Sequence, residues 1–181
     1  LPTDQIENIG LRERQLVWGR DAVNKAVPGD ISLPFLEANL NRNISVGNLS
    51  YGLFRADGNG GESYREVSAE KTAFGFELAD AHAIYDHSAG MVTMSVDDGS
   101  LIIDFLENSF ATSLSLSNDL TGQVDFRAAG KIFDGGFLRA IESTQRLSGA
   151  ISYDGTEAGY LFERQLGEGL ISGLTLWNSQ K

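Results

Sequence analysis

Residues 147–162 constrain the fold of this chain most, because they read as a strand, a tight turn and a returning strand. The sequence there is Leu-Ser-Gly-Ala-Ile-Ser-Tyr-Asp-Gly-Thr-Glu-Ala-Gly-Tyr-Leu-Phe. Gly149, Gly155 and Gly159 stand where a strand would enter, turn and leave. Glycine at such points permits a positive φ or a close approach of two backbones. The stretch therefore predicts a β-hairpin whose backbones pack tightly.

Short runs of alternating apolar and polar residues, bounded by Gly, Asp, Asn or Ser, continue along most of the chain. Turn signals that recur about every 8–12 residues are typical of an all-β meander. A sheet of about eight such strands hides its edges best by closing on itself. We therefore expect an all-β fold, an antiparallel meander closed into a small barrel. Strands are predicted at residues 49–53, 74–78, 110–117, 124–128, 150–153, 158–163 and 170–177.

A further hairpin is predicted around residues 92–105. Val92, Met94 and Val96 alternate with polar residues, and Leu101, Ile103 and Phe105 do so again. Between them stands Asp97-Asp98-Gly99-Ser100, which has the composition of a turn. The large residues of one parity are expected to face inward and to fill a small barrel: Phe74, Phe76, Leu101, Ile103, Phe105, Phe110 and Phe126.

The N-terminal part has a different pattern. Residues 15–20 predict a strand that carries Trp18, and residues 32–40 predict a short helix with Ser32 as its cap and Pro34 in its first turn. We accordingly divide the chain into an N-terminal segment, residues 1–44, and a β-barrel domain, residues 45–181.

The closing hairpin resembles that of the β-barrel domains in bacterial transferrin-binding-protein-B-like surface lipoproteins. Gly149, Gly155, Glu157, Ala158 and Gly159 match the family's pattern, whereas Ile151 stands where the family has an aromatic residue. Residues 99–117 are similar to the family's Asp-Phe, short turn and Ser-rich strand unit, and the resemblance extends over the C-terminal part of the chain. The C-terminal domains of FecR-type periplasmic proteins are a weaker match. The resemblance implies a barrel that serves as a scaffold or binding module without catalytic residues.

The charge of the chain limits its partners. It has 25 Asp plus Glu against 14 Lys plus Arg, a formal net charge of -11. Nucleic acid and anionic lipid need a basic footprint, so neither is expected as a partner. There is no cysteine, which excludes disulfides, thiolate metal sites and a cysteine-borne lipid anchor within the chain. No apolar run is long enough to span a bilayer, so direct membrane insertion is not expected.

Acidic residues are concentrated in one part of the chain. Residues 72–126 contain nine acids and no Lys or Arg. Such a stretch is either a solvated face or a docking surface for a protein with a basic surface. Three of its acids are predicted to be partner-binding: Asp97, Asp98 and Asp119.

Other polar groups give weaker indications of chemistry. Asp80 and His82 share a strand face as metal ligands can, and residues 57–62 carry oxygen ligands without the spacing of a calcium loop. Four scattered acids could pair as in a glycosidase, but they are more typical of outward strand faces: Asp104, Glu107, Asp125 and Glu163. We expect no metal, no cofactor and no catalytic residues.

These patterns indicate a non-enzymatic, monomeric β-barrel domain of the bacterial cell envelope, or of a secreted protein. It would act as a binding or structural module within a larger secreted, periplasmic or surface protein. The alternative is a lipocalin-like carrier, in which a barrel keeps a cavity for a small apolar ligand.

Overall fold

The computed structural model describes residues 15–20, 42–47, 51–56 and 73–180, and all of its regular structure is β. The predicted helix at residues 32–40 lies outside the described residues. Three strands form a small antiparallel sheet in the order β1-β3-β2: β1 (Leu16–Arg20), β2 (Arg42–Gly47) and β3 (Tyr51–Ala56). This confirms the strand predicted at residues 15–20.

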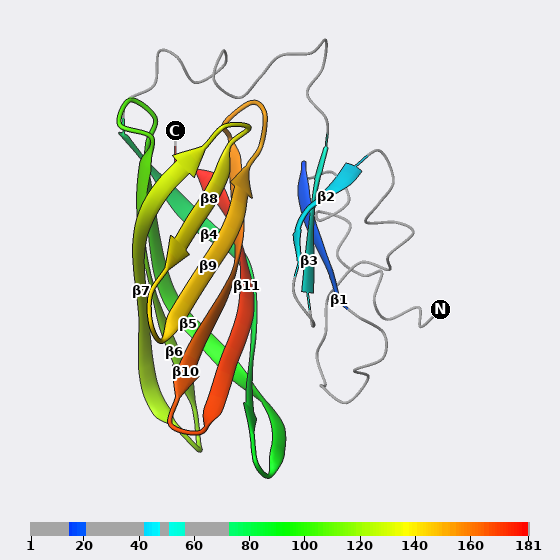
Figure 1. Cartoon of the computed structure of the whole chain (residues 1–181), viewed down its shortest axis with the longest axis vertical. Coiled ribbons are helices and arrows are strands. Elements are labelled where there is room, and N and C mark those ends of the chain that lie inside the picture. Colours follow the sequence, from blue (N-terminus) through cyan, green and yellow to red (C-terminus); the bar gives the residue numbers. More distant parts are fainter. Residues whose placement is uncertain (1–14, 21–41, 48–50, 57–72, 181) are drawn as a thin grey trace.

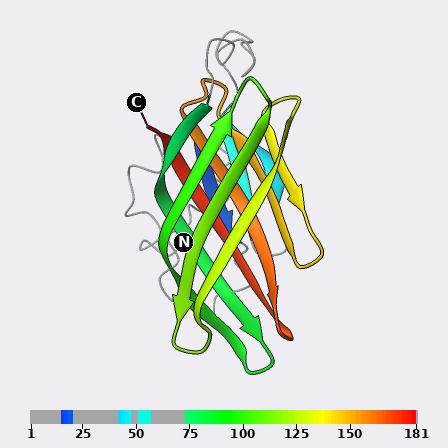
Figure 2. The same cartoon turned by 90° about the vertical axis from the view of Figure 1, so that its left-hand side faces the viewer.

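The other eight strands close into an antiparallel barrel in the order β10-β11-β4-β5-β6-β7-β8-β9. They are β4 (Ala73–His87), β5 (Gly90–Asp104), β6 (Ser109–Asn118), β7 (Gly122–Phe133), β8 (Phe137–Ile141), β9 (Gln145–Ile151), β10 (Glu157–Leu166) and β11 (Gly169–Ser179). The three-stranded sheet lies beside the barrel (Figure 1), and a second view shows how steeply the barrel strands tilt (Figure 2). The predicted all-β barrel is confirmed, and the domain boundary at residue 45 stays a prediction.

Side chains of alternate parity fill the barrel interior, as the sequence predicted. The inward-facing residues Leu101, Ile103, Phe105, Phe110 and Phe126 are buried in one hydrophobic cluster. Phe76 is buried in it as well, and Phe74 packs against it while staying partly exposed.

Aromatic rings from the last two strands complete the packing. Tyr160 stacks on Trp177 with 5.9 Å between ring centroids, and Phe126 lies 5.0 Å from Phe162. The Tyr160 hydroxyl is 2.8 Å from the Thr112 hydroxyl, which satisfies a polar atom in the core. Burial raises the pKa of Tyr160, so its phenol stays neutral.

The hairpin predicted at Asp97-Asp98-Gly99-Ser100 was wrong. Strand β5 runs without a turn from Gly90 to Asp104, and its pairing with β6 shifts between Val96 and Asp98. Asp97 is therefore the extra residue of a β-bulge, a feature that local composition does not separate from a turn. The chain turns instead between β4 and β5, next to Gly90, whose φ of 121° favours glycine.

A second bulge changes which way part of β4 faces. Leu176 pairs with Asp80 and Trp177 with Leu78, so Ala79 is skipped and the side-chain alternation reverses there. Phe76 and Leu78 belong to the interior, whereas His82 pairs with Leu174 on the outer side of the wall. His82 therefore does not share a face with Phe76 and Leu78.

The small sheet covers the outer side of the barrel near β9–β11. Its Leu16 and Leu53 are fully buried, as are Leu174 and Leu176 on the outer side of β11. Arg55 of β3 anchors the contact: its guanidinium donates hydrogen bonds to the carbonyls of Gly135 (2.5 Å) and Ile151 (3.1 Å). Most of β11 and residues 158–162 of β10 are accordingly buried on both faces.

The β9–β10 turn holds the beginning of β1. The Glu157 carboxylate accepts hydrogen bonds from the backbone N–H groups of Gln15 and Leu16, and Asp154 accepts one from the Gln15 side chain. Burial would raise the pKa of Asp154, but hydrogen bonds from Thr156, Gln15 and Ser152 outweigh it and hold the pKa below its ordinary value. The ionised form of Asp154 is therefore preferred in the folded protein.

We expect Asp154→Asn to lower stability most at neutral pH. A carboxyl whose pKa is depressed by folding contributes stability above its unfolded pKa, and that contribution is lost as the pH falls through the lower, folded pKa. The difference in unfolding free energy between wild type and variant should thus shrink below about pH 4. Urea unfolding across a pH series measures it, with the exposed Asp119→Asn as control. A difference that stayed constant down to pH 2 would contradict this role of Asp154.

Candidate functional site

Asp97 is fixed in place on the outer wall of the barrel. Its carboxylate accepts hydrogen bonds from the hydroxyls of Ser95 (2.7 Å) and Ser117 (2.6 Å), so it joins β5 to β6. The hydrogen bonds from Ser117 and then Ser95 lower the pKa of Asp97. A fixed, fully ionised carboxylate on an exposed wall is suited to recognising a cation.

Asp98 and Asp119 lie on the same wall. Asp98 is exposed and accepts a hydrogen bond from the N–H of Gly99 (2.8 Å). Asp119 is exposed in the β6–β7 turn, which the Asn118 side chain shapes by accepting from the N–H groups of Leu120 and Thr121. Asp119 follows Ser117, the partner of Asp97, by two residues, or about 7 Å of strand. The structure thus brings the three predicted residues to one region.

Serine side chains cover much of the wall between these acids. Ser100 and Ser113 share a hydrogen bond of 2.8 Å, and Gln123 donates one of 3.1 Å to Ser115. Short hydroxyl side chains leave the wall flat and hydrophilic, which suits a docking surface that excludes few partners by shape.

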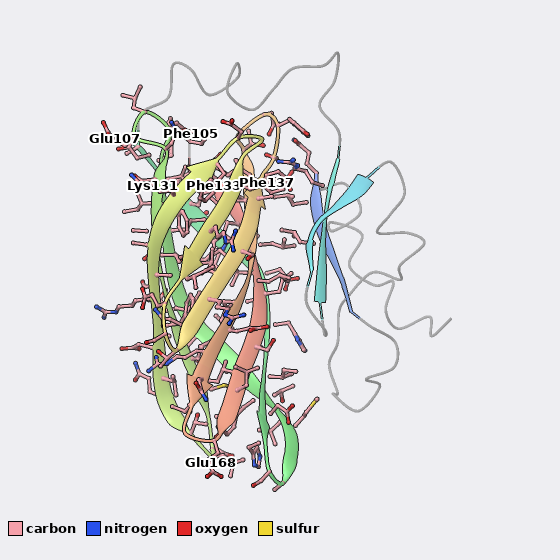
Figure 3. All side chains as sticks on the ribbon, viewed as in Figure 1. Phe105, Glu107, Lys131, Phe133, Phe137 and Glu168 are labelled. Carbon is pink, nitrogen blue, oxygen red and sulfur yellow. The ribbon has the colours of Figure 1, made fainter. Side chains whose placement is uncertain are left out.

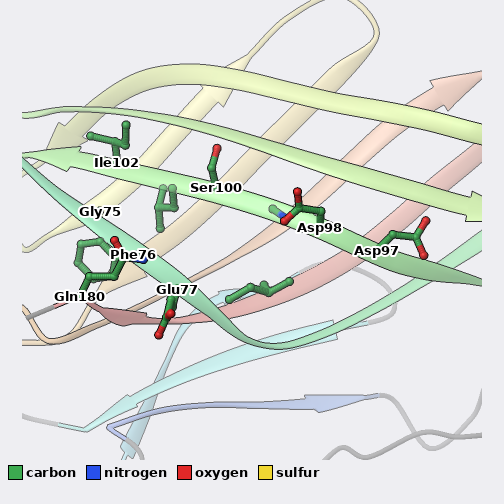
Figure 4. Close-up of a pocket in the computed structure, with 11 residues that line it drawn as sticks. Gly75, Phe76, Glu77, Asp97, Asp98, Ser100, Ile102 and Gln180 are labelled. Carbon is green, nitrogen blue, oxygen red and sulfur yellow. The ribbon is translucent and has the colours of Figure 1, made fainter.

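A hollow of about 550 Å³ opens in this wall between β4 and β5 (Figure 4). Three acids lie at its edge, namely Glu77, Asp97 and Asp98, and the rest of the lining is Gly75, Phe76, Leu78, Gly99, Ser100, Leu101, Ile102 and Gln180. Glu77, Ser100 and Gln180 carry no motif, and the bulges that bring them together are not visible in the alternation of the sequence. Sequence reasoning therefore missed them.

The opposite side of the barrel has the opposite character. Strand β8 is four strands from β4 in either direction around the closed barrel. A second hollow, of about 410 Å³, lies there and includes Arg139 and Arg146 in its lining. Phe133 and Ile141 beside it are 52% and 59% exposed. Figure 3 shows Phe133 and Phe137 near Lys131, toward the end of the barrel away from Glu168.

In the described part of the chain, the candidate metal-binding and catalytic residues do not come together as a reactive centre. Asp104 accepts hydrogen bonds from the N–H groups of Leu106 and Glu107, so it shapes the β5–β6 turn. Among residues 15–20, 42–47, 51–56 and 73–180 no group of three or more His, Asp or Glu side chains is placed to hold a metal ion. Residues 57–62 lie outside the described residues.

Among the described residues, no helix is long and apolar enough to cross a bilayer.

Comparison with known proteins defines the class of barrel. No protein-family model matches the sequence, and no curated protein is significantly similar to it. Among solved structures, the chain is similar to intact Ap-TbpB with its N and C lobes: 12% identity, a TM-score of 0.51, and coverage of 73% of this chain and 30% of that one.

It is also similar to transferrin binding protein B (TbpB) from Haemophilus parasuis Hp5, with 10% identity, a TM-score of 0.50, and coverage of 77% of this chain and 32% of that one. The chain therefore has a TbpB-like β-barrel fold and spans about a third of the length of these proteins. The comparisons give no support to the weaker similarity to FecR-type proteins.

Proposed function

We propose that this chain is a non-enzymatic binding module of a larger protein of the bacterial envelope, and that it docks a protein partner on its acidic wall. The filled interior carries this proposal. Residues from all eight barrel strands meet in one hydrophobic cluster, so a partner would have to bind on the outer surface. The acidic wall, defined by Asp97, Asp98 and Asp119, is the surface that combines fixed charge with an exposed, flat sheet.

The fold supports a protein as the partner. The TbpB structures with this fold are named for binding transferrin, which is itself a protein. The resemblance of the C-terminal part to surface lipoproteins supports a location in the envelope. Because this chain spans about a third of those proteins, the activity of the whole protein belongs to the proposal as well.

The electrostatics support a basic partner. The net charge of -11 and the absence of Lys and Arg from residues 72–126 give the acidic wall a negative potential. Such a potential speeds association with a basic surface and weakens as salt is added. A lipocalin-like carrier would instead need an internal cavity, and the packed interior favours the binding module.

Site-specific cross-linking tests this proposal. Because the chain has no cysteine, a single introduced cysteine carries a photoreactive label at one known place. We expect Leu120→Cys, beside Asp119 in an exposed turn, to form an adduct with a protein of the native cell envelope. The matched variant Ser143→Cys, exposed in the β8–β9 turn away from the acidic wall, should form none.

Two further results are expected if the acidic wall is the docking surface. High salt should abolish the adduct, and so should neutralising Asp97, Asp98 and Asp119 to asparagine in the Leu120→Cys background. Equal adducts from both labelled positions, or an adduct insensitive to salt and to the triple substitution, would show that the partner does not dock there.

A further inference from the structure

The barrel wall is open between β4 and β5. The two strands pair from Ala73 to Phe76, stop, and pair again from Ala83 onward. The β4–β5 register includes neither residues 77–82 of β4 nor residues 95–100 of β5, although both strands are paired with their other neighbours. Six residues of strand make the opening about 20 Å long.

Bulges in both strands produce the opening. Ala79 is the extra residue of β4 opposite β11, and Asp97 is the extra residue of β5 opposite β6. Bulges bend a strand and interrupt its pairing. Side chains take over two backbone N–H groups at the seam: Asp80 accepts from Ala81 at 2.9 Å and Asp98 accepts from Gly99 at 2.8 Å. The opening is therefore built into both strands.

The hollow at the seam has an apolar floor and a polar rim. Phe76, Leu78 and Leu101 belong to or pack against the hydrophobic core and also line the hollow. Gly99 allows the Trp177 ring to lie directly behind this part of the wall, because a Cβ atom on Gly99 would be 2.9 Å from that ring. Glu77, Asp97 and Asp98 line the hollow and are exposed; Figure 4 labels all three.

We propose that this seam receives the side chain of a lysine or arginine from an extended segment of the protein partner. The inference rests on the proposed function and names the place and the chemistry of docking. A lysine or arginine combines an aliphatic stem with a terminal cation, so the stem fits the apolar floor and the cation meets the rim carboxylates. Carboxylates alone would attract any cation. The apolar floor of the seam favours a cation on a long aliphatic side chain, because the stem can contact the floor.

The length and charge of the seam indicate an extended segment. An extended segment of about six residues matches the opening, and in it alternate side chains point the same way. Residues 72–126 supply no Lys or Arg that could fill the hollow from these strands. A cation at the rim therefore has to come from outside β4 and β5.

Peptide binding tests the proposal. The probe is a fluorescein-labelled peptide of alternating lysine and threonine, measured by anisotropy, with alternating glutamate and threonine as the control peptide. We expect the variant Glu77→Gln/Asp97→Asn/Asp98→Asn to bind the lysine peptide at least about tenfold more weakly than wild type. The matched variant Asp86→Asn/Asp125→Asn/Glu168→Gln loses three exposed charges away from the hollow and should lose less than about threefold.

Two readouts depend on the hollow itself. Ser100→Trp changes no charge and places a large ring at the opening, so it should abolish binding. In a Trp18→Phe background Trp177 is the remaining tryptophan, and its emission should change on binding because it borders Gly99. Thermal unfolding of every variant verifies that the fold is intact.

The outcomes separate this inference from the proposed function. The proposed seam site would be wrong if both triple variants lost the same affinity for the lysine peptide, Trp177 emission did not change and Ser100→Trp bound normally. Docking on the acidic wall would then still be possible. Failure of the wild type to bind the lysine peptide would also contradict the proposed seam site. The cross-linking experiment tests docking on the acidic wall independently.

Discussion

Replacing Gly149 by alanine is expected to lower the free energy of unfolding by about 3 kcal/mol or more. Gly149 faces inward from β9, where it pairs with Leu138 of β8 and Tyr160 of β10. A Cβ atom there would lie 2.2 Å from the carbonyl oxygen of Gly159 and 2.6 Å from the Cβ of Tyr160. Backbone of a closed barrel cannot move aside cheaply, so β9 would have to separate from β10.

Urea unfolding of Gly149→Ala measures this effect, with Ser148→Ala as the control. Ser148 is the exposed neighbour on the same strand, so its substitution should change stability by less than about 0.5 kcal/mol. Gly155→Ala should fall between the two, at about 1 kcal/mol, because the φ of 72° at Gly155 disfavours a side chain. Unfolding of Gly149→Ala at the wild-type urea concentration would contradict the close approach of β9 and β10.

The closing hairpin could be predicted because its signals are local. Gly155 has the positive φ that the turn needs, and Gly149 and Gly159 stand at close backbone approaches. Alternation likewise identified the inward residues of β6 and β7, since both strands pair without a bulge along their whole contact. Where side chains alternate strictly between the two faces of a strand, the inward residues predicted from the sequence are those observed in the structure.

The two β-bulges account for the features of β4 and β5 that could not be predicted from the sequence. Asp97-Asp98-Gly99-Ser100 has turn composition, but the hydroxyls of Ser95 and Ser117 hold Asp97 within a continuous strand. Ser117 is 20 residues away, so this stabilising contact is not local. The skipped residue Ala79 reverses the faces of β4 without any signal in the sequence. The hollow depends on both bulges, and for that reason only its acids could be anticipated.

Part of the barrel was missed for a different reason. Strand β8 has five residues, and the exposed outward position Ile141 is apolar, so apolar and polar residues do not alternate along it. The double burial of β10 and β11 comes from the small sheet packed outside them, and the position of that sheet depends on contacts such as Arg55 with Ile151, 96 residues apart. Neither pattern can be inferred from neighbouring residues.

Replacing Arg55 by alanine is expected to lower the free energy of unfolding by about 3 kcal/mol and to loosen the small sheet from the barrel. The guanidinium is buried, lies 4.4 Å from the Tyr153 ring centroid and 4.8 Å from that of Phe137, and donates to the Gly135 and Ile151 carbonyls. Alanine would remove both cation–π contacts and leave these carbonyls without their donor.

Arg55→Lys separates the charge from the shape of the side chain. In Arg55 one nitrogen, Nη1, donates to both carbonyls while the planar guanidinium lies over the two rings. Lysine keeps the cation but has no planar group to stack on the rings, so we expect an intermediate loss of stability. Limited proteolysis reports on the sheet itself: in Arg55→Ala, cleavage between β1 and β3 should become faster while residues 73–180 stay protected. If instead the barrel strands were cleaved as readily as the sheet, or Arg55→Ala unfolded like the wild type, Arg55 would not be the anchor that holds the sheet against the barrel.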